Sequence, residues 1–471
     1  MTLGGIALSS RADLFFREYG RTKVAFIGVG VSNFESALLF LNRGMDVTVL
    51  DRDDRSKLAK SAEILEARGA KFVCGAKYLD NLCDFDIVIR SPGVYFKKPQ
   101  LQTAIKQGVV VISEMELFFD FCPCKIIGIT GSDGKTTTTT LVANMLRQEG
   151  YNVHVGGNIG KALLPEIDRV SESDLAVVEL SSFQLISMRR SPNISVITNI
   201  SPNHLDIHGD MHEYISAKRG VVLHQTGFDS LVLNLDNQLS NSQELLARGF
   251  VKKFSRKQSV DNGAFFDAQT QKIYFARNGK VEPVLDRSDI RLPGMHNVEN
   301  YLAAVSAVYE MVSPESIKAV ARGFAGVRHR IEFVREKDGV MWYNDSIATS
   351  PTRTIAGLKC FDGNVLLIAG GYDKNFDYDC LAVHILKKVK VLILMGNTSK
   401  KIETAVKNNN YYNKDQLKVF NVENMDQAVK LASELARVGD MVYLSPASAS
   451  FDLYDNFQQR GDHFVNLVKN L

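Results

Sequence analysis

A glycine-rich loop that ends in lysine and threonine is the part of the sequence best suited to chemistry. Residues 125–140 read Lys-Ile-Ile-Gly-Ile-Thr-Gly-Ser-Asp-Gly-Lys-Thr-Thr-Thr-Thr-Thr, which indicates an apolar strand, a tight turn and a helix start. The first N–H groups of such a helix have no intrahelical acceptor, and with the helix dipole they attract a phosphate. A lysine here suits the terminal phosphates, and the following hydroxyl suits Mg²⁺. The loop predicts an ATP site formed by Gly131, Ser132, Asp133, Gly134, Lys135, Thr136 and Thr137.

The spacing of this loop departs from the usual phosphate loop at one position. Ile129 stands where a first glycine is expected, so the loop has the shorter form Thr-Gly-Ser-Asp-Gly-Lys-Thr. An ordinary turn would give no reason for two glycines, a lysine and a threonine to occur together. Threonines are poor helix formers, but Leu141, Val142, Met145 and Leu146 recur at helical spacing and Gly150 follows. We expect a helix over 135–149.

Polar groups at two further strand ends could hold a metal. Glu179 directly follows the apolar run 175–178, and parallel strands end at the same sheet edge, so its carboxylate can face the loop and bind Mg²⁺. A surface glutamate is the alternative. His204 follows the strand expected over 194–200 and suits a Mg²⁺ or phosphate contact.

Three histidines spaced four residues apart raise the question of zinc. His204, His208 and His212 have this spacing, but Pro202 and Gly209 argue against one unbroken helix across them. We therefore expect the second and third histidines on the surface or in loops. The residues alone likewise predict that Lys218 is a solvated lysine on a helix face.

The N-terminal part has the pattern of a nucleotide-binding βαβ unit. Residues 23–30 indicate a buried strand and a glycine turn, followed by a helix over 34–43 and a strand over 46–50 that ends in Asp51. Asn33 replaces the third fingerprint glycine, which argues against a nicotinamide cofactor and leaves a nucleotide diphosphate open. A strand over 87–90 leads into Ser91-Pro-Gly93, which is either a phosphate-binding turn or a plain loop.

Strands and helices alternate along the rest of the chain, which predicts α/β domains with parallel sheets. Strands are expected over 175–180, 194–200, 230–235, 340–344, 365–371, 391–395 and 441–444, and a helix after Gly294. The pattern restarts after Gly326, and the stretch 113–123 is expected to link the first two domains. The predicted domains are 1–117, 118–325 and 326–471.

Composition excludes some functions. The 471 residues carry a net charge of +3, too small to favour a nucleic-acid or membrane-surface partner. The six cysteines lack Cys-x-x-Cys spacing, which favours reduced thiols in a cytosolic enzyme. We find no pattern of an export signal or membrane anchor, and expect a cytoplasmic protein.

The motifs together resemble a known family. Eight motifs occur in the order seen in the Mur ligases. They are the phosphate loop, Val177-Val-Glu-Leu-Ser-Ser-Phe-Gln184, Asn203-His-Leu-Asp206, Lys218, His296-Asn-x-x-Asn300, His329-Arg330, Asn344-Asp-Ser346 and Ser445-Pro-Ala-Ser-Ala-Ser-Phe-Asp452. The resemblance spans all three predicted domains. It implies a Rossmann-like UDP-binding domain, a P-loop ATPase-like central domain with a mostly parallel sheet, and a Rossmann-like C-terminal domain.

The resemblance also implies a reaction. It is closest to the members that join D-glutamate to UDP-N-acetylmuramoyl-L-alanine in peptidoglycan precursor synthesis, using ATP to form an acyl phosphate, and it leads us to expect a monomer. Phosphorylation supplies the leaving group that a carboxylate lacks, so the protein mainly positions reactants and neutralises charge.

The resemblance assigns roles to particular residues, including some already singled out by their types and spacing. Catalytic roles fall to Lys135, Lys218, His204 and Arg330. Two Mg²⁺ sites would use Thr136, Glu179, His204 and Lys218, the last carbamylated and so converted from a cation to an anion. ATP would also contact Asn297, Asn300, Arg330 and Asp345. The UDP-substrate would contact Val31, Ser32, Asp51, Ser91, Gly93, Asn158 and Ser181. The amino acid would contact Lys374, Ser450, Phe451 and Phe457.

The stretch 445–452 is expected to expose hydroxyls and N–H groups at a helix start, where the distal carboxylate of glutamate could bind. The chain departs from the family at Ile347, where lysine is frequent, and at Asn203, where an acidic residue is common. Other Mur ligases and folate-polyglutamating ligases are alternatives, although the latter lack a UDP-binding domain. A nucleotide-gated switch would keep Lys135 and Thr136 but has no use for a third domain or Lys218.

Overall fold

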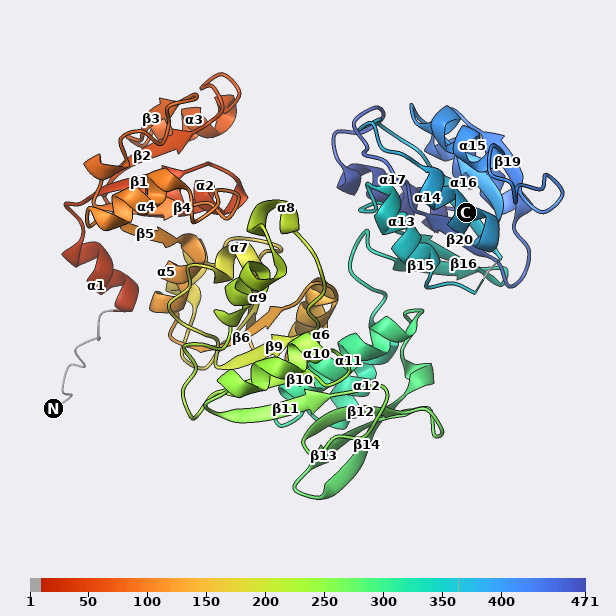
Figure 1. Ribbon diagram of the computed structural model, residues 1–471, viewed down its shortest axis with the longest axis horizontal. Helices are drawn as coiled ribbons and strands as arrows, with labels where there is room; N and C mark the ends of the chain where they lie inside the picture. Colours follow the sequence, from red (N-terminus) through yellow and green to blue (C-terminus); the bar gives the residue numbers. More distant parts are fainter. Residues whose placement is uncertain (1–9, 363) are drawn as a thin grey trace. The chain divides into compact units, whose positions relative to one another are not determined.

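The computed structural model describes residues 10–362 and 364–471, with the side chains of Val31, Ser32, Ala59 and Asp206 left out (Figure 1). The chain forms two compact units. The first contains the residues up to Arg287 together with Glu299–Val320, and the second contains Ser288–Val298 and Ala321–Leu471. Among the described helices, none is long and apolar enough to cross a membrane.

The first unit begins with a five-stranded parallel sheet in the order β3-β2-β1-β4-β5. Its strands are β1 (Lys23–Ile27), β2 (Asp46–Asp51), β3 (Lys71–Cys74), β4 (Ile87–Arg90) and β5 (Val110–Ser113). Its helices are α1 (Arg11–Glu18), α2 (Val31–Asn42), α3 (Ala59–Glu66), η1 (Leu82–Asp84), α4 (Pro99–Lys106) and α5 (Glu114–Phe121). Strand order reverses direction between β1 and β4, and such a switch point leaves a crevice at the strand ends.

The stretch expected to link the first two domains is not an open linker. Residues 114–121 form α5, which begins with a capping box between Ser113 and Glu116 and is buried along nearly its whole length. Its apolar residues Leu117, Phe118 and Phe121 join the core that the first two sheets share. The sequence Glu-Met-Glu-Leu-Phe-Phe-Asp-Phe is therefore a packed helix between two sheets.

A six-stranded parallel sheet follows in the order β11-β10-β9-β6-β8-β7. Its strands are β6 (Lys125–Thr130), β7 (Val153–Gly157), β8 (Leu175–Glu179), β9 (Ile194–Ile197), β10 (Ser230–Asn234) and β11 (Phe250–Phe254). The helices from this sheet onward are α6 (Lys135–Gln148), η2 (Leu164–Arg169), α7 (Ser182–Leu185), α8 (Leu205–His208), α9 (Met211–Arg219), α10 (Gln238–Asn241), η3 (Ser242–Leu246), η4 (Arg287–Asp289), α11 (Met295–Val308) and α12 (Pro314–Gly323). The predicted helix after the loop is confirmed, ending at Gln148.

An antiparallel sheet of three strands was not predicted. It contains β12 (Gly263–Asp267), β13 (Lys272–Arg277) and β14 (Lys280–Asp286), seen below β11 in Figure 1. The turn between the last two strands is Asn278-Gly279, and both residues have positive φ. Asn-Gly between two alternating segments is a strong hairpin signal, so the sequence did contain the information.

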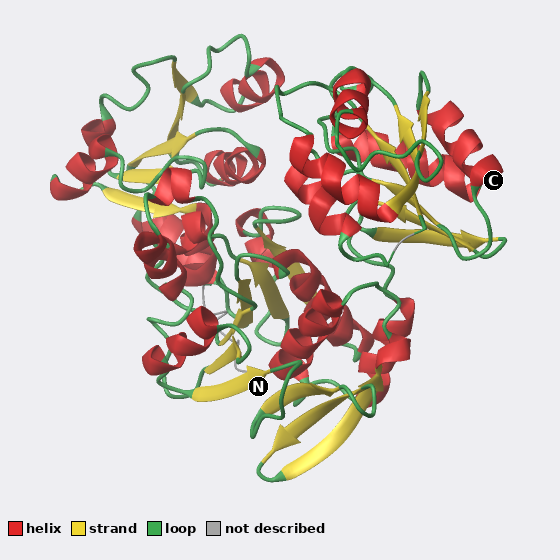
Figure 2. Cartoon of the chain, turned by 45° about the vertical axis from the view of Figure 1, so that its right-hand side comes forward, coloured by secondary structure: helices red, strands yellow, loops and turns green. Residues whose placement is uncertain are grey.

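The second unit contains a six-stranded sheet in the order β15-β16-β20-β17-β18-β19, in which only β15 is antiparallel to its neighbour. The strands are β15 (Glu332–Lys337), β16 (Val340–Asn344), β17 (Val365–Ala369), β18 (Val389–Leu394), β19 (Lys418–Asn421) and β20 (Met441–Leu444). The helices are α13 (Pro351–Leu358), α14 (Asp379–Lys388), α15 (Ser399–Lys407), α16 (Met425–Leu435) and α17 (Phe457–Lys469), and they cover both faces of the sheet (Figure 2).

Two cores lie on the opposite faces of this second-unit sheet. Leu367 of β17 packs in one core with α14, and its neighbours Leu366 and Ile368 pack in the other with α16 and α17. A strand buried on both faces reads as a continuous apolar run, which is why β17 and β20 could be predicted. The α/β fold class with mostly parallel sheets is confirmed.

Candidate active site

The predicted phosphate loop connects β6, in the interior of its sheet, to the start of α6. Gly131 and Gly134 both have positive φ, at 152° and 77°. A Cβ atom at Gly131 would collide with Thr198 Oγ1, and one at Gly134 would collide with Asn300 Oδ1. Glycine is required at both positions by backbone conformation and by close approach.

The neighbouring strand β9 holds the loop in place. Ser132 N donates to Asn199 O at 2.9 Å, and Asp133 N donates to Asn199 Oδ1 at 3.0 Å. The Thr198 hydroxyl donates to Asp133 O at 2.6 Å. These two residues were not among those predicted from the sequence, although their position at the end of β9, at the same sheet edge as the loop, was a usable signal.

Residues of the loop differ in what their side chains contact. The Ser132 hydroxyl is buried, donates to Ser201 O at 2.9 Å and lies 3.0 Å from the Tyr214 hydroxyl, so it ties the loop to its surroundings. Lys135 Nζ donates to Gly131 O at 3.0 Å and Ser132 O at 2.9 Å, which holds the ammonium group against the loop. Thr136 and Thr137 are buried in the first turn of α6.

Lys218 of α9 is buried beside the loop, contrary to the interpretation from the residues alone. It is 2% exposed, its Nζ donates to Gly131 O at 2.8 Å and Thr130 Oγ1 at 3.3 Å, and it lies 4.8 Å from the Tyr214 ring centroid. Burial, reinforced by the charge of Lys135, lowers the Lys218 pKa well below its ordinary value. The neutral, nucleophilic form of this amine is therefore more populated than it is in an exposed lysine.

Glu179 ends β8 next to β6, where its backbone pairs with Ile129. Its Oε1 accepts a hydrogen bond from Asn158 Nδ2 at 2.8 Å, so the structure brings these two predicted residues together. Its Oε2 is buried and has no hydrogen-bond partner among the described residues. A buried carboxylate oxygen without a partner, beside a phosphate loop, fits a hard divalent cation such as Mg²⁺.

The histidines that follow β9 differ in their surroundings. His204 has a left-handed backbone (φ 54°) at the start of α8, and its ring centroid lies 5.2 Å from that of Phe183. His208, expected on the surface or in a loop, is buried at the end of α8: it stacks on Phe183 at 4.9 Å, and its Nε2 lies 2.9 Å from the Ser182 hydroxyl. The α8 turn directs it inward, and burial lowers its pKa. His212 is exposed.

The predicted UDP-binding residues of the N-terminal sheet gather at the ends of β1, β2 and β4. Asp51 accepts from Val29 N at 3.2 Å, which fixes the glycine turn after β1. Gly28 faces the Ser91 side chain, and Val94 N closes the turn around Gly93 by donating to Ser91 O at 3.0 Å.

The residues around the turn after β1, and Ser181 at the start of α7, differ in what the structure shows of them. Asn33, in place of the third glycine, is buried and donates to Ile27 O at 3.0 Å, so it braces the turn. Val31 and Ser32 begin α2, but their side chains lie outside the described part of the chain. Ser181 forms a capping box with Gln184 at the start of α7.

In the second unit, Arg330 and Asp345 lie close together. His329 and Ile331, on either side of Arg330, have positive φ values of 64° and 44°, and such strain in a β-branched residue is costly. The buried Asp345 carboxylate accepts from Tyr443 Oη at 2.5 Å and Ser445 Oγ at 3.0 Å. Burial raises the Asp345 pKa to about 6, and the hydrogen bonds and the charge of Arg330 oppose this rise.

The two asparagines predicted to contact ATP belong to different units. Asn297, in the second unit, donates to Pro293 O at 2.7 Å, while Asn300, in the first unit, accepts from Thr138 Oγ1 at 3.4 Å.

The stretch 445–452 differs from its prediction. Ser445, Ser448 and Ser450 are buried, and the next helix, α17, begins only at Phe457. The Ser448 hydroxyl lies 2.9 Å from Tyr378 Oη and 2.8 Å from Thr398 Oγ1, and the Ser445 hydroxyl donates to Asp345 Oδ2 at 3.0 Å. These two hydroxyls therefore satisfy interior groups where surface exposure was expected.

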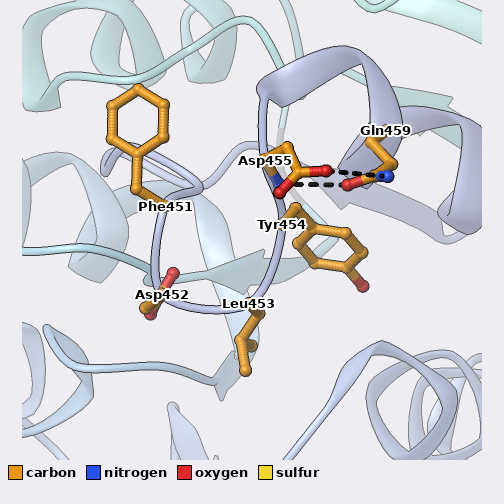
Figure 3. A pocket seen from close by; sticks show the side chains of 6 residues that line it. All are labelled: Phe451, Asp452, Leu453, Tyr454, Asp455 and Gln459. Carbon is orange, nitrogen blue, oxygen red and sulfur yellow. Dashed lines mark hydrogen bonds between the residues drawn. The ribbon is translucent and has the colours of Figure 1, made fainter. Parts of the chain in front are cut away.

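Two of the predicted amino-acid ligands do meet at the surface. Lys374 Nζ lies 5.7 Å from the centroid of the exposed Phe451 ring. Phe451 also borders an open pocket of about 440 Å³, with Asp455 and Gln459 hydrogen-bonded to each other on its wall (Figure 3). Phe457 lies elsewhere, with its ring 6.0 Å from that of His329.

Known proteins and family models match this chain over most of its length. Three family models match successive segments: Mur ligase MurD-like, N-terminal domain over 22–113, Mur ligase middle domain over 129–308, and Mur ligase, glutamate ligase domain over 329–448. The chain is 45% identical over 467 residues to UDP-N-acetylmuramoylalanine--D-glutamate ligase of Acetivibrio thermocellus, covering 98% of this chain and 100% of that protein. It is 47% identical over 449 residues to the protein of the same name from Clostridium botulinum (strain Okra / Type B1), covering 95% and 97%.

Solved structures share the fold at lower identity. UDP-N-acetylmuramate-alanine ligase from Thermotoga maritima aligns with a TM-score of 0.56 and 18% identity over 96% of this chain and 100% of that chain. MurF ligase from Thermotoga maritima, in complex with ADP, aligns with a TM-score of 0.54 and 15% identity over 96% of each chain. With family models matched along its length and relatives close to half identical over nearly all of it, the chain belongs to the Mur ligase family.

Proposed function

We propose that this protein joins D-glutamate to UDP-N-acetylmuramoyl-L-alanine in an ATP-dependent step of cytoplasmic peptidoglycan precursor synthesis. The names of its full-length relatives support the substrates. The observation that carries the proposal is Lys218, buried against Gly131 and Thr130 of the phosphate loop. A nucleotide switch has no use for a buried lysine there in addition to Lys135, whereas an acyl-phosphate-forming ligase does.

The reaction has two displacements. The L-alanine carboxylate attacks the γ-phosphorus of ATP, and the bond to the bridging oxygen breaks to release ADP. The D-glutamate amine then attacks the acyl carbon, loses a proton, and phosphate leaves with its oxygen. In this scheme the loop amides and Lys135 hold the ATP phosphates, which places the developing negative charge against fixed dipoles and a cation.

Metal binding completes the charge balance. Bound Mg²⁺ would neutralise phosphate charge, and Thr136 and Glu179 would hold it, as the partnerless Oε2 of Glu179 supports. A second Mg²⁺ would use His204 and a carbamylated Lys218. The neutral Lys218 amine would attack CO₂ and lose a proton, and burial favours that neutral form because it lowers the pKa.

The glutamate site is proposed in the second unit. The Lys374 ammonium, exposed beside Phe451, is suited to the distal carboxylate, together with Ser450 and near Phe457. The D configuration rests on the relatives' names. Four further expectations stay predictions. They are a monomeric state, the contacts of the UDP-substrate residues, the domain limits 1–117, 118–325 and 326–471, and the ATP contacts of Asn297, Asn300, Arg330 and Asp345.

One assay tests the function. Phosphate release from ATP is measured with UDP-N-acetylmuramoyl-L-alanine and, in turn, D-glutamate, L-glutamate, D-glutamine and L-lysine. We expect release only when both substrates are present and fastest with D-glutamate. Faster turnover with L-lysine than with either glutamate would reassign the acceptor to that of another Mur ligase, and faster turnover with L-glutamate would overturn only the stereochemistry. Release with ATP alone at the full rate would favour the switch alternative.

A further inference from the structure

A buried arginine joins two segments of the first unit that are expected to bind opposite ends of the UDP-substrate. Arg90 is the last residue of β4 and is 1% exposed. Its Nη1 donates to Val94 O at 2.8 Å and Ser91 O at 3.3 Å, both in the turn predicted to bind UDP. Its Nη2 donates to Phe183 O at 2.9 Å and the Ser187 hydroxyl at 3.2 Å, in and just after α7. One guanidinium group therefore spans the two segments.

Further contacts hold the same junction. Glu116 of α5 accepts from the Ser187 hydroxyl at 2.8 Å, and its charge partly offsets the burial that lowers the Arg90 pKa to about 10. Tyr95 donates to Glu213 of α9 at 2.5 Å, and Lys97 forms an ion pair with the same carboxylate. The turn after β4 is thus connected both to α7 and to the helix that carries Lys218.

A contribution to stability does not by itself account for the buried Arg90 guanidinium. A buried guanidinium carries a large desolvation cost, and apolar residues often replace buried ionic groups without loss of stability. Arg90 Nε has no hydrogen-bond partner among the described residues, which adds to that cost. What the planar fork does provide is a fixed distance between two backbone segments, because both ends bind main-chain carbonyls.

We infer that Arg90 is a positioning residue that sets the spacing between the turn Ser91–Val94 and the segment that follows Ser181. The inference rests on the proposed function, in which the turn binds the UDP end of the substrate and Ser181 reaches toward its reacting end. A substrate held at both ends is sensitive to that spacing, whereas UDP, held only at the turn, is not.

The test compares the full substrate with UDP. For wild type, Arg90→Lys and Arg90→Met, one measures kcat, KM for UDP-N-acetylmuramoyl-L-alanine, KM for ATP, and the inhibition constant of UDP. In Arg90→Met we expect kcat/KM for the full substrate to fall on the order of tenfold or more, because misplacement by about 1 Å can cost 10²-fold. The UDP inhibition constant and KM for ATP should change less than about threefold. Arg90→Lys should show a loss of similar size, because one ammonium can hold only one of the two segments and so does not fix the spacing between them.

Controls separate positioning from folding. Arg147→Met removes another arginine that donates to a carbonyl, Val153 O at 2.9 Å, at the far end of α6, and should leave the ratio of the two constants unchanged. If Arg90→Met does not fold in a thermal melt, Arg90→Lys and Ser187→Ala give the ratio instead. Equal losses for UDP and full substrate, or no loss in a folded variant, would overturn the inference while leaving the function intact. A wild-type protein inactive with both substrates would overturn the proposed function, and the inference with it.

Discussion

Two turns rich in small polar residues follow interior strands of two different sheets, and the molecule uses them in opposite ways. After β6, the loop 131–134 leads at once into α6, and its lysine lies over the loop carbonyls. After β20, Ser445 and Ser448 turn inward to buried hydrogen-bond partners, and no helix begins until Phe457. A helix start provides unpaired N–H groups that an anion can satisfy, whereas serines without one satisfy the interior. The comparison teaches that the helix after the turn, more than the small residues in it, is the feature that predicts a phosphate site.

The largest expected effect comes from the lysine of the first turn. Lys135→Ala should reduce ligation on the order of 10²-fold or more, because a charge-assisted phosphate contact that strengthens in the transition state is lost. Thermal unfolding should change little, since the side chain is only partly buried. The measurement is phosphate release dependent on D-glutamate, alongside a melting curve. Near-normal turnover in a folded variant would remove the ATP-site assignment and with it this side of the comparison.

The second lysine beside that turn should be almost as sensitive. Lys218→Ala should lose on the order of 10²-fold in activity, and added formate or acetate should partly restore it by supplying an anion next to the proposed metal site. Lys218→Arg keeps the positive charge but cannot be carbamylated, so it is the matched control and should be equally inactive without being restored. Full activity of Lys218→Arg would show that Lys218 acts only as a cation.

Residue patterns predicted the first turn and its helix because strand, glycines, lysine and helical periodicity are all local. Lys218 shows where local information ends: its burial depends on how α9 packs against Thr130 and Gly131, which lie far away in the sequence. His208 was misplaced for the same reason, since its partner Phe183 belongs to another segment. The exposure predicted for the serines of 445–450 was wrong, because their composition suits a binding turn and a buried hydrogen-bond network equally well.

The carboxylate that the second turn supports should make stability depend on pH. Burial raises the Asp345 pKa to about 6 from 3.8, so the folded state holds its proton more tightly than the unfolded state. The stabilisation is complete below pH 3.8, falls as pH rises, and is lost above about pH 6; a shift of about 2 units corresponds to about 3 kcal/mol. Between pH 3.8 and about pH 6, the free energy of unfolding of wild type should therefore fall by about 3 kcal/mol relative to that of Asp345→Asn.

The measurement is urea unfolding of both proteins at several pH values between 4 and 7. Taking the difference between them removes the contribution of other buried acids such as Glu114, whose pKa burial raises to about 7. A difference in the free energy of unfolding that does not vary with pH would show that Ser445 and Tyr443 stabilise the ionised carboxylate fully. The second turn would then resemble the first, as a place built for negative charge.

The smallest effect, and the sharpest contrast with Lys135→Ala, is expected from Ser448→Ala. The Ser448 hydroxyl lies between Tyr378 Oη and Thr398 Oγ1, and removing it leaves those buried hydroxyls one partner short, which typically costs about 1–3 kcal/mol. Unfolding should shift to lower urea concentration, while kcat/KM for glutamate should stay within about twofold, because a buried network is weakened and no proposed ligand is touched. Lys135→Ala should show the reverse pattern of lost activity and unchanged stability. A Ser448→Ala protein of normal stability with a clearly raised KM for glutamate would mean that Ser448 serves an anion in addition to the proposed ligand Ser450, and the contrast between the two turns would fail.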